Sequence, residues 1–263
     1  MEQAIFISKI ENLKYVNSKY TRLYFGNEFC QRLIPPLEDL KVIRDFVSGH
    51  QMSFNLVTPY VTDRGIDALR PILEYVIKNF SDAEIVINDW GIFRLLRREF
   101  NHINLILGRL LTKQKRGPRI LNLKDKVPQD TIQHFQESNI DVPILSEFLI
   151  NNGIKRVELD NLLQGIFRKD TCFLKASLYF PFAYVTTTRF CLTASSETGR
   201  KFLRNIPSCN KECQKYIFSL RHKNMPVNLF VKGNTQFFKN ERLPDNCNNL
   251  NIDRIVYEPE IPL

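Results

Sequence analysis

Short apolar runs alternate with longer segments of helical apolar spacing between about residues 50 and 190 of this chain. The short runs are typical of strands buried on both faces, and they lie at 53–59, 84–87, 103–107, 155–159, 173–179 and 183–187. The segments with helical spacing predict helices at 63–80, 90–100, 130–139, 146–152 and 160–167. Strands that alternate with helices predict parallel pairing through crossover helices. We therefore expect an α/β fold, a TIM-barrel-like (β/α) barrel that is incomplete or irregular because the repeats number fewer than eight, with an open parallel sheet as the alternative.

The two ends of the chain show a different pattern. Before residue 50, two short β-like pieces and one segment of helical spacing lie at 4–7, 22–25 and 37–47. Near the C-terminus, a hairpin is predicted from two β-rich runs around the turn signal Lys-Gly-Asn, at 227–231 and 235–239, and a last strand at 253–257. The sequence has neither an internal repeat nor a linker-like stretch. We therefore expect one domain over residues 1–263, with the hairpin as a C-terminal extension.

Composition is that of an ordinary globular protein, with 43% hydrophobic and 25% charged residues among 263. The net charge of +9 favours an anionic partner: nucleic acid, a carboxylated or phosphorylated small molecule, or an acidic protein face. A solvated basic surface explains this charge equally well. No apolar run approaches the length needed to span a bilayer, and the first residues lack the features of a secretory signal. We therefore expect a cytoplasmic protein.

Three of the six cysteines gather in the segment 189–213, where Cys191 is followed by Cys209 and Cys213 with three residues between the last two. In a chain without an export signal, grouped thiolates predict metal or cluster ligands before disulfides. Three thiolates leave an iron–sulfur cluster or a zinc ion one ligand short, so a fourth ligand would have to come from elsewhere. The alternative interpretation is that these cysteines are ordinary small buried residues.

Several familiar catalytic motifs are absent from the sequence: G-x-S-x-G, H-E-x-x-H, the Walker loop and G-x-G-x-x-G. None of the four histidines is paired with another at metal-ligand spacing. In a barrel, function gathers at the carboxyl ends of the strands. Four polar side chains at or near those ends are candidates for catalysis: Asn88, Asp89, Arg109 and Glu158. Asp89 is equally well explained as the N-cap of the following helix.

A basic segment follows the predicted strand at 103–107. Together with Arg109, its cationic side chains are candidates for binding a substrate anion through charge and forked hydrogen bonds: Lys113, Lys115, Arg116 and Arg119. A solvated loop would carry the same charges.

Six motifs in combination resemble the collagenase-like peptidase superfamily, the U-32 class. They are GNEFC at 26–30, TPYVTDRG at 58–65, INDWG at 87–91, LGRLLTKQKRGPR at 107–119, VELDNLLQG at 157–165 and the cysteines of segment 189–213. Within that superfamily the chain is most similar to the UbiU/UbiV-type iron–sulfur proteins of oxygen-independent ubiquinone biosynthesis. The resemblance covers about residues 20 to 258.

The resemblance implies a 4Fe–4S cluster held by four cysteines: Cys30, Cys191, Cys209 and Cys213. Zinc on the same cysteines is the chemical alternative. The remaining two, Cys172 and Cys247, have no counterpart in the family pattern.

The resemblance also implies a function. Related proteins act in oxygen-independent hydroxylation of quinone precursors or of RNA bases, so we expect a small aromatic or quinone-like substrate and a homologous partner subunit in a heterodimer. RNA is the less favoured substrate, because this chain lacks the added C-terminal domain of the RNA-acting members. Two further functional classes stay open: a peptidase, for which the sequence supplies no nucleophile–base pair, and a non-catalytic subunit with a structural metal site.

Overall fold

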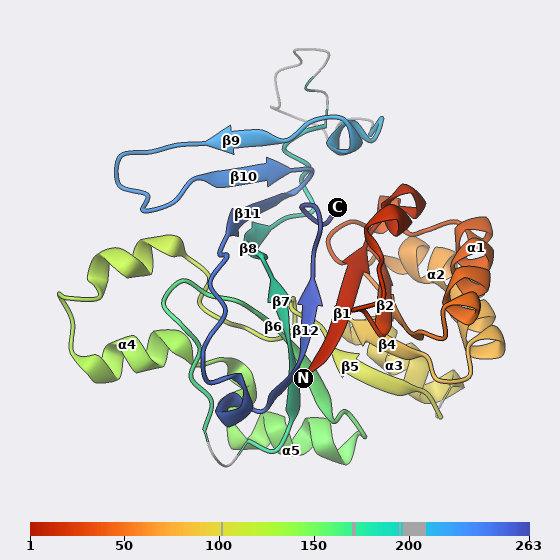
Figure 1. Cartoon of the computed structure of the whole chain (residues 1–263), viewed down its shortest axis with the longest axis horizontal. Coiled ribbons are helices and arrows are strands. Elements are labelled where there is room, and N and C mark those ends of the chain that lie inside the picture. Colours follow the sequence, from red (N-terminus) through yellow and green to blue (C-terminus); the bar gives the residue numbers. More distant parts are fainter. Residues whose placement is uncertain (101, 170–171, 195, 197–208) are drawn as a thin grey trace.

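The chain folds around a closed barrel of eight parallel strands (Figure 1). The computed structural model describes residues 1–100, 102–169, 172–194, 196 and 209–263. In order around the barrel the strands are β1 (Glu2–Ile7), β12 (Ile252–Tyr257), β7 (Lys175–Phe180), β6 (Arg156–Asp160), β5 (Asn104–Leu107), β4 (Glu84–Ile87), β3 (Ser53–Val57) and β2 (Arg22–Gly26). The predicted TIM-barrel-like α/β fold is confirmed.

Both ends of the chain belong to the barrel, which the pattern between residues 50 and 190 did not predict. β1 pairs with β12 on one side and with β2 on the other, so that Ala4 lies opposite both Val256 and Arg22. The barrel is therefore closed, and its irregularity lies in the connections. A 3-10 helix, η1 (Ile10–Tyr15), joins β1 to β2, and an inserted antiparallel sheet separates β7 from β12.

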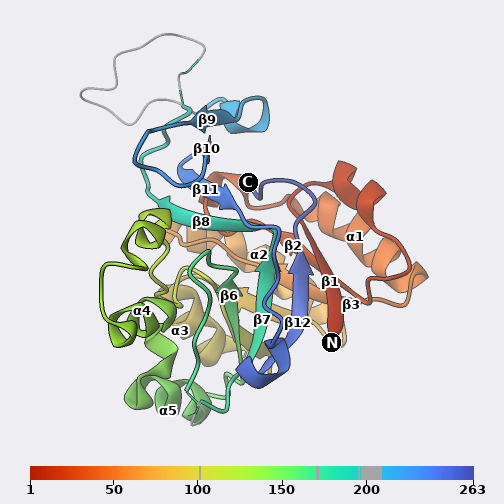
Figure 2. The ribbon, with the colours of Figure 1, turned by 60° about the vertical axis from the view of Figure 1, so that its left-hand side comes forward.

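The α-helices lie outside the barrel (Figures 1 and 2). They are α1 (Leu37–Gly49), α2 (Asp63–Asn79), α3 (Trp90–Glu99), α4 (Gln129–Gln136) and α5 (Pro143–Asn151). Short 3-10 turns complete the connections: η2 (Gln31–Leu33), η3 (Pro118–Leu123), η4 (Asn139–Asp141), η5 (Glu212–Gln214) and η6 (Cys247–Leu250). The helix predicted at 160–167 is wrong: Asp160 ends β6 and the next residues form turns. Asp160 does not cap a helix because its carboxylate is held by Arg109 (3.0 Å) and Arg116 (2.6 Å).

The inserted sheet has the order β8 (Phe182–Thr187), β11 (Thr235–Lys239), β10 (Leu229–Lys232) and β9 (Phe218–Leu220), with antiparallel pairing throughout. It lies over the carboxyl end of the barrel (Figures 1 and 2). The predicted hairpin is confirmed as β10–β11, whereas β8, expected in the parallel series, belongs to this second sheet. Phe29 joins the barrel to the sheet, since its ring packs edge-on against Tyr184 and Phe237 with centroids 5.3 Å apart in both cases.

The barrel interior is apolar in the middle and charged at both ends. Its central layer consists of Ala4, Phe6, Tyr24, Val57, Val86, Ile106, Tyr179 and Val256. At the amino end, Arg254 pairs with Glu2 (2.6 Å) and Glu84 (2.8 Å) and donates to the Tyr24 hydroxyl (2.7 Å). A larger apolar core lies between the barrel and the helices. Among the helices of the described residues, none is long and apolar enough to cross a membrane.

Candidate metal centre and the pocket beside it

Four cysteines from distant parts of the sequence line one small pocket, here called the cysteine pocket. They are Cys30, Cys191, Cys209 and Cys213. Cys30 follows β2, Cys191 follows β8, and Cys213 lies in η5. The unfilled space between them is about 50 Å³, whereas a single water needs only roughly 10–15 Å³ of such space. Much of segment 189–213, namely residues 195 and 197–208, lies outside the described residues.

Two of the thiols in this pocket have raised pKa values. Burial, together with the charges of the other three cysteines, raises the pKa of the Cys30 thiol to about 11. Burial likewise raises the pKa of Cys213, against a hydrogen bond that Gln214 donates to its sulfur at 3.3 Å. These thiols therefore stay protonated at neutral pH unless a metal replaces their protons, since metal ligation deprotonates a thiol outright.

A single-ion site and a cluster site need different ligand spacings. Within the part of the chain that the structure describes, no three His, Cys, Asp or Glu side chains converge closely enough to hold one metal ion. A tetrahedral zinc requires all four sulfurs within about 2.3 Å of a single point. A cubane cluster is ligated through separate irons, so its thiolates surround a wider space. Among the described residues, the four thiols do not form a preformed tetrahedral site for a single ion.

Two asparagines hold the loops that carry the cysteines. The Asn27 side chain accepts hydrogen bonds from the backbone N–H groups of Phe29 (3.0 Å) and Cys30 (2.9 Å). Asn234 donates to the carbonyls of Phe29 (2.6 Å) and Thr188 (2.7 Å), so it ties the loop after β2 to the end of β8. The preceding residue, Gly233, has φ +62°, and a Cβ there would lie 2.5 Å from Leu263 and 3.3 Å from Cys213. The Lys-Gly-Asn turn thus allows the hairpin to approach the cysteine pocket closely.

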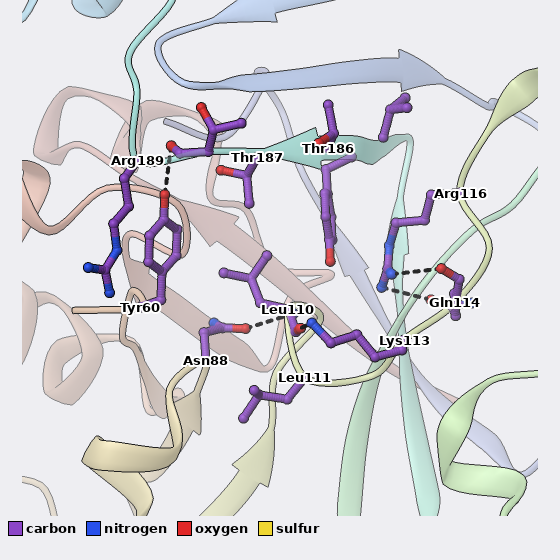
Figure 3. Close-up of a pocket in the computed structure, with 13 residues that line it drawn as sticks. Tyr60, Asn88, Leu110, Leu111, Lys113, Gln114, Arg116, Thr186, Thr187 and Arg189 are labelled. Carbon is purple, nitrogen blue, oxygen red and sulfur yellow. Dashed lines mark hydrogen bonds between the residues drawn. The ribbon is translucent and has the colours of Figure 1, made fainter. Parts of the chain in front are cut away.

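A larger pocket of about 450 Å³ opens at the carboxyl end of the barrel beside the cysteine pocket (Figure 3). This mouth pocket is lined by Tyr60, Asn88, Leu110, Leu111, Lys113, Gln114, Arg116, Tyr184, Val185, Thr186, Thr187, Thr188 and Arg189. Arg189 lines both pockets. The Tyr60 hydroxyl donates to the Thr188 carbonyl (2.8 Å) and accepts from Asn234 (3.0 Å), a residue of the cysteine pocket. The two pockets therefore share a wall.

The mouth pocket is cationic and aromatic. Its described lining contains three cations and two tyrosines, and it includes no Asp, Glu, His, Ser or Cys. The guanidinium of Arg116 already has partners within the protein, since it pairs with Asp160 (2.6 Å) and donates to the carbonyls of Arg109 (2.7 Å) and Thr112 (2.8 Å). Lys113 and Arg189 are exposed and donate only to the carbonyls of Leu110 (2.7 Å) and Val61 (3.4 Å) in the described chain. Figure 3 shows Lys113 and Arg189 on opposite sides of the space.

The candidate catalytic residues do not form one site. Asn88 lines the mouth pocket, but its amide donates to the Thr58 carbonyl (3.0 Å) and accepts from the Leu110 N–H (3.0 Å). Asp89 is the N-cap of α3 and accepts from Gly91 at 2.6 Å, as the N-cap interpretation predicted. Glu158 is fully buried inside the barrel, where it accepts from the Tyr24 hydroxyl (3.1 Å) and burial raises its pKa to about 8.

The five anion candidates are also dispersed. Arg109 is fully buried and its guanidinium is paired with three carboxylates: Glu28, Asp160 (3.0 Å) and Glu258 (2.7 Å). Its charge is balanced inside the protein, as is that of Arg116. Lys113 alone of the five lines the mouth pocket with its charge accessible, while Lys115 and Arg119 lie outside its lining. The sequence analysis did not name Arg189, Tyr60 or Asn234 as site residues. Each lies in a stretch that it singled out, at 189–213, at 58–65 and in the Lys-Gly-Asn turn, but only folding brings these three connections together.

The two cysteines without a family counterpart lie away from the cysteine pocket. Cys172 accepts a hydrogen bond from Arg168 (3.1 Å), and Cys247 donates to the Pro244 carbonyl (3.2 Å). Both are buried in the main apolar core.

No protein-family model and no curated protein matches the sequence. In structure, the chain is similar to the U32 peptidase Mk0906, with 8% identity over 100% of this chain and 94% of that chain and a TM-score of 0.48. It is similar to a glycoside hydrolase family 18 N-acetylglucosaminidase from Paenibacillus barengoltzii, with 8% identity over 97% and 94% of the two chains and a TM-score of 0.37. A Group IV chitinase from Ostrinia furnacalis gives 9% identity, 97% and 91% coverage and a TM-score of 0.32. Likenesses this remote carry no information about family or function.

Proposed function

We propose that this chain is an iron–sulfur protein of the U-32 class that contributes to an oxygen-independent hydroxylation. The cluster would be a 4Fe–4S cluster on Cys30, Cys191, Cys209 and Cys213. The observation that carries the proposal is that these four cysteines, from segments up to 183 residues apart (213 − 30), line one pocket, and that this pocket shares a wall with the mouth pocket. Cysteines that are only small buried residues would not be expected to line one pocket in a group of four, and these four form no disulfide.

The protein's own residues have two roles in this proposal. The cysteines hold the cluster, which supplies one-electron transfer when bound and, with four thiolates, has no open iron position for substrate. The mouth pocket binds the substrate: its size lies within the range of small-molecule sites, roughly 300–1,000 Å³. Tyr60 and Tyr184 offer aromatic rings, and Lys113 and Arg189 offer positive charge. This lining suits a small aromatic or quinone-like anion.

The composition of the mouth pocket argues against hydrolysis of a peptide or a glycoside. Peptide hydrolysis needs an activated nucleophile or a metal-bound water, and glycoside hydrolysis generally needs carboxyl groups at the scissile bond. The described lining supplies none of the usual groups for either reaction. A basic pocket of limited volume also suits a small molecule better than RNA, which single-strand binders hold along extended basic grooves.

The cluster is tested by anaerobic purification with iron and sulfide analysis and a visible spectrum. We expect a brown protein with about four irons per chain, and loss of iron in each alanine variant of the four ligands. Cys172→Ala and Cys247→Ala are the matched controls and should keep the iron. A protein that stays free of iron after anaerobic reconstitution would refute the proposal, and stoichiometric zinc on the same cysteines would replace it with a structural metal site.

The role of the mouth pocket is tested separately. In the iron-loaded protein, Lys113→Ala and Arg189→Ala should keep the cluster spectrum but weaken hydroxylation of an anionic aromatic substrate in an anaerobic assay with the partner subunit. Lys115→Ala, outside the lining, is the control. Unchanged turnover in both pocket variants would mean that the substrate binds elsewhere.

A further inference from the structure

One cationic side chain lies between the cysteine pocket and the mouth pocket. Arg189 follows β8 and lines both of them. In the described chain its guanidinium donates only to the Val61 carbonyl, at 3.4 Å. The guanidinium carbon lies 6.0 Å from the centre of the Tyr60 ring, at the edge of the mouth pocket (Figure 3). Neither contact neutralises the charge of Arg189, so this charge is open to an anion on either side of the shared wall.

The other cations of the two linings each belong to one pocket. Arg32 lines the cysteine pocket but not the mouth pocket, and Lys113 lines the mouth pocket but not the cysteine pocket. Arg116, the third cation of the mouth pocket, is already paired with Asp160 at 2.6 Å. The described linings of both pockets contain no Asp or Glu. Among the described lining residues, Arg189 is therefore the one cation that both pockets share.

A single guanidinium cannot serve both pockets at full strength. A carboxylate in the mouth pocket would take forked hydrogen bonds from Arg189, the geometry in which arginine binds an anion best. On the other side, one-electron reduction of a cluster by an external electron donor adds one negative charge to the cysteine pocket, and no atom is transferred. A positive charge against the cluster favours reduction, since net charge and hydrogen bonds to the sulfurs set the reduction potential. An anion that occupies Arg189 therefore makes reduction less favourable.

We propose that Arg189 couples the redox state of the cluster to the binding of the substrate anion. This inference rests on the proposed function, since it needs both the cluster and an anion in the mouth pocket. Arg189 binds the anion more tightly while the cluster is oxidised and less tightly once the cluster is reduced. The two effects are equal in free energy, because coupling between two binding equilibria is reciprocal. Couplings between sites are typically about 5–150-fold. Because Arg189 is exposed and salt screens its charge, we expect the lower end, about fivefold.

The experiment uses the full chain, purified anaerobically and loaded with iron, with benzoate as the probe anion. Equilibrium dialysis gives the dissociation constant of benzoate for the oxidised and for the reduced protein, and this constant should be about fivefold larger after reduction. The midpoint potential of the cluster is measured by a dye-mediated titration followed by electron paramagnetic resonance. At saturating benzoate this potential should fall by the same factor, which is about 40 mV at 59 mV per tenfold for one electron.

Four variants separate the two sides of the shared wall. Arg189→Gln should reduce the effect of saturating benzoate on the potential to less than about twofold, since only screened charge across the wall remains. Arg189→Lys keeps the charge and should keep the direction of the effect. Arg32→Gln, the matched control in the cysteine pocket, should lower the potential without benzoate but keep the full benzoate effect. Lys113→Gln should weaken benzoate binding equally in both redox states, so that only the concentration needed for saturation changes.

The outcomes distinguish this inference from the proposed function on which it rests. A benzoate effect that is lost in Arg189→Gln and kept in Arg189→Lys and Arg32→Gln would support it, with far-UV circular dichroism as the check on folding. A cluster whose potential does not respond to saturating benzoate would overturn the coupling and leave the proposed function in place. A response that survives Arg189→Gln in full would also overturn it. A protein that forms no cluster, or that does not bind benzoate, contradicts the proposed function itself and this inference with it.

Discussion

Replacing Arg109 by methionine tests the arrangement of charges at the carboxyl end of the barrel. Arg109 is fully buried and pairs with Glu28, Asp160 and Glu258, all of them fully or almost fully buried. Methionine keeps much of the side-chain volume but removes the guanidinium. Breaking a buried pair from one side costs about 3–5 kcal/mol, because an uncompensated charge stays buried. For a domain of this size that corresponds to a fall in melting temperature of roughly 6–20 °C.

The pH dependence of this loss follows from the carboxylates left behind. In the wild type, burial raises the pKa of Glu28, and it raises that of Glu258 to about 8, while Arg109 opposes both shifts. Without Arg109 these folded-state pKa values rise further above the unfolded values. The folded variant then binds more protons than the unfolded chain over a wider range, so its stability falls more steeply as the pH rises. The cost of the substitution should therefore be larger at pH 8 than at pH 6.

Urea unfolding followed by far-UV circular dichroism at both pH values measures this cost. Arg70→Met is the matched control, because Arg70 pairs with Glu99 at the exposed surface, where solvent screens the pair and it contributes little to stability. The double variant Arg109→Met/Glu258→Gln should recover part of the loss, since it removes one of the stranded carboxylates. A cost for Arg109→Met no greater than that of the control, or one that does not grow with pH, would refute this account of the barrel interior.

Three further predictions follow from single residues. Glu258 has a raised pKa in the folded state, so the wild type should lose up to about 1.4 kcal/mol of stability per pH unit between the ordinary carboxyl pKa of 4.5 and about 8. Glu258→Gln should make this pH dependence less steep, and urea unfolding at several pH values from 5 to 9 measures the slope. Asp89→Ala should cost about 1 kcal/mol through loss of the α3 N-cap and leave the iron content unchanged. Gly26→Ala should prevent stable folding, because Gly26 has φ +137° and a Cβ would lie 2.1 Å from the Val57 carbonyl oxygen, whereas Gly49→Ala, with open space around it, should be neutral or stabilising in the same melting experiment.

Local pattern was sufficient to predict the strands and insufficient to predict how the barrel closes. Strands buried on both faces read as continuous apolar runs, and the runs at 53–59, 84–87, 103–107 and 155–159 correspond to β3 to β6. Closure depends on the pairing of β1 with β12, whose residues lie some 250 positions apart, and nothing in either short piece predicts that partner. The false helix at 160–167 has the same origin, since Asp160 looks like an N-cap until two arginines from another part of the chain reach it.

The candidate site was predicted only in part, because its contacts also join residues that lie far apart in the sequence. Arg109 was expected to meet a substrate because it follows a strand and opens a basic segment. The carboxyl ends of all barrel strands converge, however, and this brings Glu28, Asp160 and Glu258 to its guanidinium from 81, 51 and 149 residues away. These pairings satisfy its charge inside the fold. A single sequence contains no signal for contacts at such separations.

The cysteine pocket lies between the barrel mouth and the inserted sheet. One side comes from the loop after β2, which carries Cys30, and the other from the connection between β8 and β9, which carries Cys191 and Cys213. Asn234 also connects these two sides, because its side chain donates to the carbonyls of Phe29 and Thr188. Ligands that are brought together only by folding make metal binding part of the folding free energy. A cluster bound here would therefore hold the sheet over the barrel and, through Arg189 in the shared wall, would also hold the shape of the mouth pocket. Cluster binding and substrate binding are for this reason expected to be coupled even if no electron passes between them.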